Sequence, residues 1–291
     1  MTRPTIISLG EVLWDLFPAG ARFGGAPANF ACHAAILGGN VAIVSAVGDD
    51  ERGREAISIL SKFNVDVSLV QTTPDAATGT VGVELDENHK PDFTIHADSA
   101  WDRIEWKNEI DAKIRSADAV YFGTLGQRSE ISRNTIQNAL DAAKQAGVAR
   151  IVDINLRPPF FDDALIIDSI QLASILKLSD DELPQVCQAL QIKSDHADEE
   201  TLREILNSQS LDMVVMTRGA KGAVLVTADG TVDHPGVPAD VKDTVGAGDS
   251  FTAAFLIGVL RGDPPKTFLG DACRVAAKVC GHVGAVPDTT S

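Results

Sequence analysis

The chain has 291 residues, of which 44% are hydrophobic and 23% charged, a composition typical of a globular protein and not of a disordered or collagen-like one. Asp and Glu number 41 against 25 Lys and Arg, and the net charge of −16 disfavours docking on nucleic acid or an anionic membrane. The longest apolar run, 253–260, is far shorter than the roughly 20 residues that span a bilayer. The four cysteines form no C-x-x-C pair, so we expect a reduced, cytoplasmic protein.

Short runs rich in Val and Ile alternate with helical stretches along the chain. We predict strands at 5–9, 41–47, 119–122, 150–154, 174–178, 213–217 and 223–227. Helices are predicted at 27–37, 53–63, 132–146, 180–190, 199–207, 248–260 and 266–281. Most of the strands are continuous apolar runs, as expected for strands buried on both faces. This alternation predicts an α/β fold with a doubly wound, mostly parallel sheet.

Two segments depart from this pattern. Residues 78–96 read as two strands around a turn with no helix between them, and 11–17 adds a further candidate strand. They predict a small β-sheet, which is either a lid over a site at the strand ends or an ordinary surface hairpin. The acidic run 195–200 is interpreted as a solvated loop and helix start rather than a metal site.

Several common enzyme motifs are missing from the sequence. There is no G-x-x-x-x-G-K-[ST], no G-x-G-x-x-G after the first strand, no H-E-x-x-H and no G-x-S-x-G. These absences argue against P-loop nucleotidases, nicotinamide Rossmann enzymes, common zinc proteases and α/β-hydrolases. The six histidines show no metal-ligand spacing.

The segment 243–255 carries the strongest chemical signal. Small residues at Gly246, Ala247 and Gly248 precede a nearly all-apolar helix that should be buried. Its free N–H groups and positive dipole end form an anion site that a phosphate can approach closely. Asp249 then has two interpretations. It either caps the helix or accepts a proton from a hydroxyl that attacks the bound phosphoryl group.

A second signal lies in 23–31. Gly24 and Gly25 precede Pro27, which is well suited to the first helical position. Asn29 then lies in the first turn, where its amide could hydrogen-bond a polyol. The alternative is a Gly-Gly turn followed by an incidental Asn.

Taken together, these segments resemble the signatures of ribokinase-type (PfkB) carbohydrate kinases, most of all bacterial fructokinases. Residues 24–29 resemble the N-terminal signature of the family and 243–249 its C-terminal signature. Further matches, in the right order, are at 10–15, 48–53, 153–157, 179–182 and 217–222. The resemblance covers the whole chain. It implies a single ribokinase-like α/β domain over 1–291, Rossmann-like, with lid strands inserted from about 11–23 and 67–100.

The resemblance also implies transfer of the γ-phosphoryl group of ATP to a sugar hydroxyl. Asp249 would be the base, and the backbone of Gly246, Ala247 and Gly248 the anion hole. The sugar would be held by Asp15, Gly24, Gly25, Asn29 and Arg157. The nucleotide would lie against Ser179, Thr217, Arg218, Gly219, Gly222, Gly248 and Cys273.

Metal ions follow from the same resemblance. Glu182 would support Mg²⁺ through water, since magnesium prefers oxygen ligands and keeps its own waters. Potassium is a further candidate, beside the anion hole. Its site would use Asp243 and carbonyls at or near Val245, Cys280, Val283 and Ala285.

Two residues depart from the family pattern. Ser179 replaces the usual Asn, which makes one phosphate contact shorter or water-mediated. Cys273 falls where ribokinases often carry an Asn on the adenine side. It either packs against adenine or is buried as a small hydrophobe.

The sequences of 24–31 and 153–159 look most like those of fructokinases, which favours D-fructose as the acceptor and fructose 6-phosphate as the product. Arg157 keeps 2-keto-3-deoxygluconate open, because it could serve a carboxylate; its alternative role is pairing with phosphate or with Asp153. A catalytically silent sensor of sugar or nucleotide is the non-enzyme alternative, against which the intact Asp249 argues. The expected partners are a small sugar and ATP, with no nucleic acid and no membrane. Pairing of lids into a homodimer is a further expectation from the family.

Overall fold

The computed structural model describes residues 3–18, 20–85, 91–193 and 198–286. Its large sheet has nine strands in the order β13-β12-β11-β10-β9-β8-β1-β4-β5. The strands are β1 (Thr5–Leu9), β4 (Asn40–Gly48), β5 (Val70–Thr73), β8 (Ala119–Gly123), β9 (Ala149–Asp153), β10 (Ile175–Ser179), β11 (Met213–Thr217), β12 (Ala223–Thr227) and β13 (Gly230–His234). All neighbouring strands pair in parallel except β11–β12 and β12–β13. The predicted doubly wound, mostly parallel sheet is confirmed.

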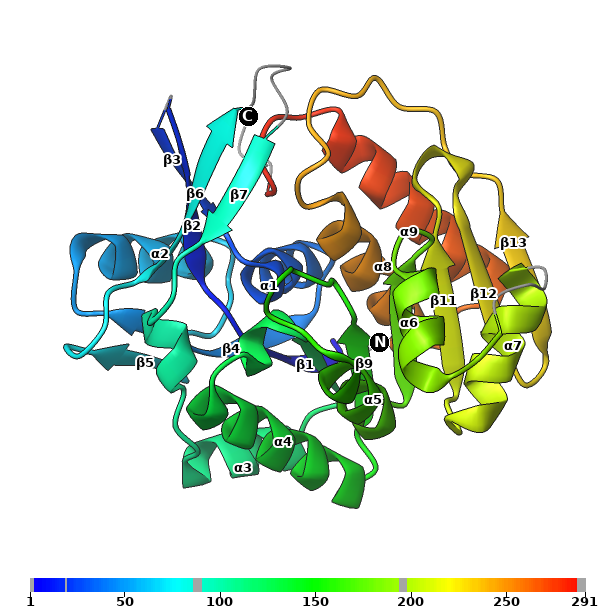
Figure 1. Ribbon diagram of the computed structural model, residues 1–291, viewed down its shortest axis with the longest axis horizontal. Coiled ribbons are helices and arrows are strands. Elements are labelled where there is room, and N and C mark those ends of the chain that lie inside the picture. Colours follow the sequence, from blue (N-terminus) through cyan, green and yellow to red (C-terminus); the bar gives the residue numbers. More distant parts are fainter. Residues whose placement is uncertain (1–2, 19, 86–90, 194–197, 287–291) are drawn as a thin grey trace.

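Helices cover both faces of this sheet (Figure 1). One face carries α1 (Ala26–Ile36), α2 (Glu51–Lys62), α8 (Ala247–Arg261) and α9 (Pro265–Cys280). The other carries α3 (Asn108–Arg115), α4 (Glu130–Gln145), α5 (Asp163–Leu172), α6 (Leu183–Leu190) and α7 (Asp198–Ser208). Successive residues of a strand point to opposite faces of the sheet. Ile6 of β1 therefore packs in the core on the side of α1 and α8, and Ile7 in the core on the side of α4 and α5. Two apolar layers therefore fix the sheet between the helices.

A separate sheet has the strand order β3-β2-β6-β7 and projects from the main body (Figure 1). It consists of β2 (Leu13–Phe17), β3 (Gly20–Gly24), β6 (Gly79–Leu85) and β7 (Pro91–Ile95), and we call it the small sheet. The strands predicted within 11–17 and 78–96 are confirmed, while the turn at 86–90 lies outside the described residues. β3 falls in the lid segment 11–23 that the resemblance implied, although the residue pattern alone did not indicate a strand there.

The predicted elements differ from the structure mainly at its edges. Strand β13 and helices α3 and α5 were not predicted, and β5, which falls in the segment 67–100 assigned to the lid, belongs instead to the large sheet. β5 reads Val-Gln-Thr-Thr at the edge of the sheet and lacks the apolar run of a central strand. The helix expected from residue 180 begins at Leu183, with Pro184 in its first turn. α7 begins at Asp198, within the acidic run, and residues 195–197 of that run lie outside the described residues.

The order of the strands also defines where a ligand can bind. The chain passes from β1 to β4 on one side and returns to β8 on the other, so a crevice opens beyond the carboxyl end of β1. Residues that follow β1, β9 and β10 meet at this edge. In the described part of the chain, no helix is long and apolar enough to cross a membrane.

Candidate active site

A cleft of about 700 Å³ lies at the carboxyl edge of the large sheet. Residues from both sheets and from the start of α8 line it. They include Glu11, Leu13, Asp15, Gly25, Asn29, Val81, Ile95, Asp153, Asn155, Arg157, Lys177, Gly246, Gly248 and Asp249. The small sheet therefore covers a site at the strand ends, which favours the lid over the surface hairpin among the two interpretations of the sequence.

Asp249 lies in the first turn of α8 and faces the cleft. The N-cap position belongs to Gly246, so the alternative that Asp249 caps the helix is wrong. Its Oδ2 accepts a hydrogen bond from Asn29 Nδ2, 2.9 Å away. Removal from solvent raises the pKa of Asp249 to about 7, although the Asn29 hydrogen bond opposes the shift. A carboxylate with this pKa is matched to proton transfer near neutral pH.

Asn29 is buried in α1 and joins the same site. Its Nδ2 is used by Asp249, while its Oδ1 is buried and has no hydrogen-bond partner among the described residues. A buried amide oxygen without a partner is costly, unless a ligand supplies a donor. The interpretation of Asn29 as an incidental residue of a Gly-Gly turn does not account for this arrangement.

The loop before α8 supplies the predicted anion site, with one difference. Gly246 has φ of +79°, and a Cβ there would overlap the Ala285 carbonyl, so glycine is required. Gly246 and Gly248 line the cleft. Ala247 was predicted to contribute as well, but it does not line the cleft, and its N–H donates to the Thr244 carbonyl at 3.2 Å. The turn that begins the helix uses this N–H internally.

Asp15 and Arg157 line the cleft on the side predicted for the sugar. Burial raises the pKa of Asp15 to about 6, against the nearby positive charges of Arg157 and Arg22. Gly25 lines the cleft, whereas Gly24 does not: a Cβ on Gly24 would come within 2.8 Å of the Asp15 carboxylate. Gly24 thus differs from its predicted role as a direct sugar contact and instead leaves room for Asp15.

A buried ion pair lines part of the cleft, and the sequence analysis missed its lysine. Lys177 Nζ is 2.9 Å from Asp153 Oδ1, and Thr252 donates to Asp153 Oδ2 at 3.1 Å. Although burial opposes the charge, Asp153 raises the pKa of Lys177 above its ordinary value. A Cβ on Gly248 would lie 3.5 Å from Nζ, so the ammonium supports the anion loop. Because Asp153 pairs with Lys177, the alternative in which Arg157 pairs with Asp153 is wrong.

One signal in the sequence pointed to Lys177. It is a charged residue within the otherwise apolar strand Ile-Leu-Lys-Leu-Ser. A charge in a strand buried on both faces needs a partner or a function. Asn155 is a second cleft residue for which no role was predicted, and it holds a left-handed φ of +40°.

Glu182 and Ser179 form a junction between two strand ends. Glu182 Oε1 accepts from the Leu156 N–H at 2.8 Å, and Oε2 accepts from the Ser179 N–H at 2.8 Å and its hydroxyl at 3.0 Å. The Ser179 hydroxyl, predicted to approach phosphates, donates to Glu182 here. Each carboxylate oxygen can accept more than one donor, so Glu182 retains capacity for a metal-bound water. The donor set fits the predicted magnesium support.

The predicted nucleotide loop follows β11. Arg218 is held by Asp233, with Nη2 2.6 Å from Oδ1. Gly219 and Gly222 both have positive φ, and a Cβ on Gly222 would overlap the His234 carbonyl. Thr217 lies at the strand end and its hydroxyl is 3.4 Å from the Leu178 carbonyl. The local backbone therefore requires glycine at Gly222, and the absence of a side chain also suits close approach of a ligand to this loop.

Cys273 lies in α9 and belongs to the apolar core on that face of the sheet. Burial raises the pKa of its thiol to about 11, with a smaller opposing effect of Arg218. It does not line the cleft. These observations favour the small buried hydrophobe among its two interpretations, although Arg218 links it to the nucleotide loop.

The predicted potassium site is occupied in part by contacts within the chain. Asp243 accepts from the Val245 N–H at 3.1 Å and the Gly284 N–H at 3.0 Å, and Arg22 of β3 is 3.4 Å from its Oδ2. The carbonyl of Cys280 accepts from the N–H groups of 242 and 243, and that of Ala285 contacts the His33 ring at 2.8 Å. The Val283 side chain is exposed. The Asp243 carboxylate lies beside the backbone of Cys280 and Gly284, but Arg22 already offers Asp243 a positive charge, and the potassium site stays a prediction.

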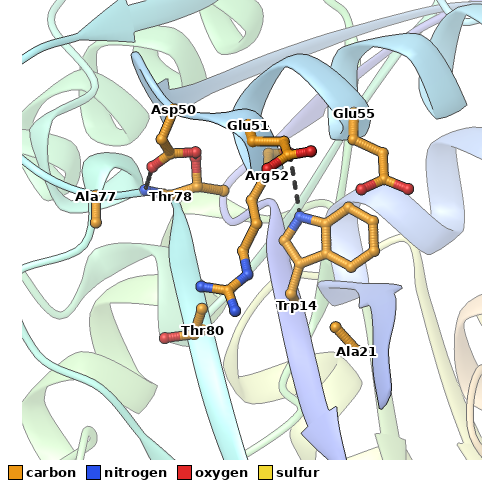
Figure 2. Close-up of a pocket in the computed structure, with 9 residues that line it drawn as sticks. All are labelled: Trp14, Ala21, Asp50, Glu51, Arg52, Glu55, Ala77, Thr78 and Thr80. Atoms are coloured by element: carbon orange, nitrogen blue, oxygen red, sulfur yellow. Dashed lines mark hydrogen bonds between the residues drawn. The ribbon is translucent and has the colours of Figure 1, made fainter.

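A smaller cavity of about 430 Å³ lies between the small sheet and α2 (Figure 2). At its edge, Asp50 accepts from the Gly53 N–H at 2.8 Å and from the N–H and hydroxyl of Thr78 at 2.8 and 2.7 Å. The Trp14 indole N–H donates to the Arg52 carbonyl at 3.2 Å. These contacts tie α2 to the base of the small sheet. The motif at 48–53 therefore has a structural role, that of anchoring β2 and β6.

The fold and the cleft together define the class of enzyme to which this chain belongs. A glycine-flanked helix start beside a carboxylate suited to proton transfer is the arrangement of a phosphoryl-transfer enzyme. A family model described as pfkB family carbohydrate kinase matches residues 19–291, and the chain belongs to this family. It is therefore a phosphotransferase with a carbohydrate acceptor.

Individual relatives agree with this assignment. The chain is 33% identical to fructokinase-2 of Zea mays over 276 residues, which is 89% of this chain and 81% of the relative. A fructokinase from Xylella fastidiosa with bound ATP has the same fold, with a TM-score of 0.87 at 22% identity over 98% of this chain and 94% of that one. A fructokinase double mutant from Vibrio cholerae O395, bound to fructose, ADP and potassium ion, has a TM-score of 0.82 at 25% identity over 98% and 94%.

Proposed function

We propose that this chain is an ATP-dependent fructokinase that phosphorylates the terminal hydroxyl of D-fructose and yields fructose 6-phosphate. The observation that carries the proposal is Asp249, whose pKa is raised to about 7 by burial, beside Gly246 and Gly248 in one cleft. The similarity to fructokinases of Zea mays and Vibrio cholerae supports fructose as the acceptor.

The reaction that this geometry supports needs one base and one anion site. Asp249 in its ionised form takes the proton of the terminal hydroxyl as the sugar oxygen forms a bond to the γ-phosphorus of ATP. The bond from that phosphorus to the bridging oxygen breaks, and ADP leaves with the electron pair. Backbone N–H groups at the start of α8, supported by the Lys177 ammonium, stabilise the charge on the transferred group. Asn29 holds Asp249 in place through the 2.9 Å hydrogen bond.

The remaining partners have sites that fit. ATP supplies the phosphoryl group and would lie along 217–222, with Glu182 supporting Mg²⁺ through water. Potassium near Asp243 would order the loop that presents Gly246, in competition with Arg22. The small sheet would act as a lid that excludes water. A homodimer through this sheet and a cytoplasmic location complete the proposal.

One observation favours a second sugar acceptor, one that carries a carboxylate. Arg157 lines the cleft, and its Nη1 donates to the Leu156 carbonyl at 3.0 Å, leaving further N–H groups for a ligand. A carboxylate such as that of 2-keto-3-deoxygluconate would suit these donors. The silent sensor is disfavoured, because Asp249 and its support by Asn29 are intact.

A coupled assay of ADP release over a panel of sugars tests the proposal. The panel contains D-fructose, 2-keto-3-deoxygluconate, ribose and glucose, each with ATP and Mg²⁺. We expect the highest kcat/KM with fructose, and a product phosphorylated at the terminal carbon by ³¹P NMR. A higher kcat/KM with 2-keto-3-deoxygluconate would replace fructose as the acceptor. ATP binding without ADP release on any sugar would support the sensor instead.

A further inference from the structure

Glu11 is a buried acid in the cleft to which neither the sequence motifs nor the mechanism above gives a task. It follows the carboxyl end of β1, which lies between β8 and β4 at the point where the order of the strands reverses. Its residue is 3% exposed, yet it lines the cleft together with Asp15, Asn29 and Asp249. A buried carboxyl group needs a compensating contact, because its removal from water is costly.

The protein satisfies this carboxyl group only in part. Backbone N–H groups of Glu11 itself and of Ala26, at the start of α1, bind it. Its Oε2 is buried and has no hydrogen-bond partner among the described residues. Burial raises its pKa to about 7, while Arg157 and Arg128 exert a weaker opposing effect. The second oxygen is thus available to a ligand, as either an acceptor or a donor.

Glu11 lines the same cleft as Asp249 but comes from a different part of the chain, the segment after β1. Its backbone carbonyl lies against Gly25 and its Oε2 faces Gly126, where an added Cβ would be 3.6 Å away. Asp249, in contrast, lies at the start of α8 and accepts a hydrogen bond from Asn29 of α1. Gly25 lines the cleft beside Glu11, and Leu13 and Asp15 of the small sheet line the same cleft.

We propose that Glu11 is a specificity-determining residue whose free Oε2 hydrogen-bonds a hydroxyl of the sugar acceptor other than the hydroxyl that is phosphorylated. The inference rests on the proposed sugar kinase activity, but not on fructose as its acceptor. A site built to bond a hydroxyl rejects analogues without it, because its own buried group is then left unpaired. Glu11 therefore selects between sugars that differ at that hydroxyl.

The test combines variants of Glu11 with a set of monodeoxy analogues of the best sugar in the panel. Glu11→Ala should lower kcat/KM for the complete sugar by about 10- to 100-fold, the worth of a hydrogen bond to a charged group. For one analogue, that which lacks the bonded hydroxyl, wild type and Glu11→Ala should agree within about twofold. The same loss with every analogue, or no loss with the complete sugar, would overturn the proposal.

A structural role of Glu11 at the start of α1 predicts a different result. Glu11→Gln retains an oxygen for the Ala26 N–H and should fold even if Glu11→Ala does not. It should show the same analogue-specific pattern, with a smaller loss, since an amide can still bond a hydroxyl. Ser45→Ala is the matched control, because it removes another buried oxygen without a described partner, outside the cleft. Its relative rates over the analogue set should equal those of wild type.

Calorimetry with sugar alone distinguishes failure of the proposed kinase activity from failure of the Glu11 inference. If no sugar releases ADP but one binds, the analogue comparison is made on Kd, and the same coupling between Glu11 and one hydroxyl is expected. If another sugar replaces fructose, its own deoxy series is used and the inference stands. If no sugar of the panel binds to the wild-type protein, the inference is wrong.

Discussion

Replacement of Asn29 by alanine should shift the pH dependence of the reaction in a calculable direction. The amide donates a 2.9 Å hydrogen bond to Asp249 and thereby favours its ionised form. A hydrogen bond to a charged acceptor is worth about 1.5 kcal/mol, and one pKa unit corresponds to about 1.4 kcal/mol. Its loss should move the pKa of Asp249 from about 7 up by about one unit. At pH 7 the ionised fraction then falls from about one half to about one tenth.

The assay is kcat/KM for the sugar between pH 5 and pH 9.5. In wild type the rate should fall on the acid side of about pH 7, where Asp249 becomes protonated. In Asn29→Ala this limb should lie about one pH unit higher, with an extra loss of roughly fivefold at pH 7 and little extra loss at pH 9. Loss of a sugar contact lowers the whole profile without moving it. An acid limb that stays in place or moves to lower pH refutes the reasoning. Asn40→Ala, which removes an exposed Asn bonded to Thr5, is the control and should retain the wild-type profile.

Three further outcomes follow from the structure. Asp15→Ala should lower kcat/KM for the sugar by at least about tenfold and leave the KM of ATP nearly unchanged, which steady-state kinetics with each substrate varied will measure. Arg22→Ala removes a positive charge 3.4 Å from Asp243, so activation by potassium over a large organic cation should rise by up to about fivefold relative to wild type; equal activation ratios would contradict this. Asp50→Ala removes two hydrogen bonds from Thr78 and the N-cap hydrogen bond from the Gly53 N–H of α2, and it should destabilise the protein by about 1–3 kcal/mol in urea unfolding. Although burial opposes it, hydrogen bonding from Thr78 and Gly53 holds the pKa of Asp50 below its ordinary value, so the loss should be present at pH 7 and disappear as the pH falls through that lowered pKa.

The sequence predicts the central part of the fold because the residues there follow one physical rule. Strands such as β1, β11 and β12 are buried on both faces, so their continuous apolar runs identify them without knowledge of their neighbours. The edge strands β5 and β13 have solvent on part of their surface and a mixed composition, which local pattern does not separate from a loop. Helix α5 is short, and Asp162 caps it by accepting from the Leu165 N–H at 2.8 Å, a signal that sequence analysis passed over.

The candidate site was predictable where a residue stands within a local motif. Asp249 and Asn29 each follow glycines at a helix start, and the structure brings them within a hydrogen bond of each other across 220 positions of the chain. Lys177 lies within β10 and Glu11 lies just after β1, and the importance of both residues depends on burial and on partners supplied by distant segments. The contact of Arg22 with Asp243 depends on how the small sheet lies over the cleft. Such placements arise from tertiary packing and carry no local signature.

The central claim is that Asp249 is the base of a sugar phosphorylation, and the kcat of Asp249→Asn with fructose and ATP tests it most directly. We predict a loss of kcat of about 10²- to 10⁴-fold with a small change in KM. Burial raises the pKa of Asp249 from 3.8 to about 7, so the cost of burying this acid grows as the pH rises between these values and is complete above pH 7. The variant should therefore have an equal or higher Tm at pH 8. A folded Asp249→Asn protein that retains near-wild-type kcat would contradict the account.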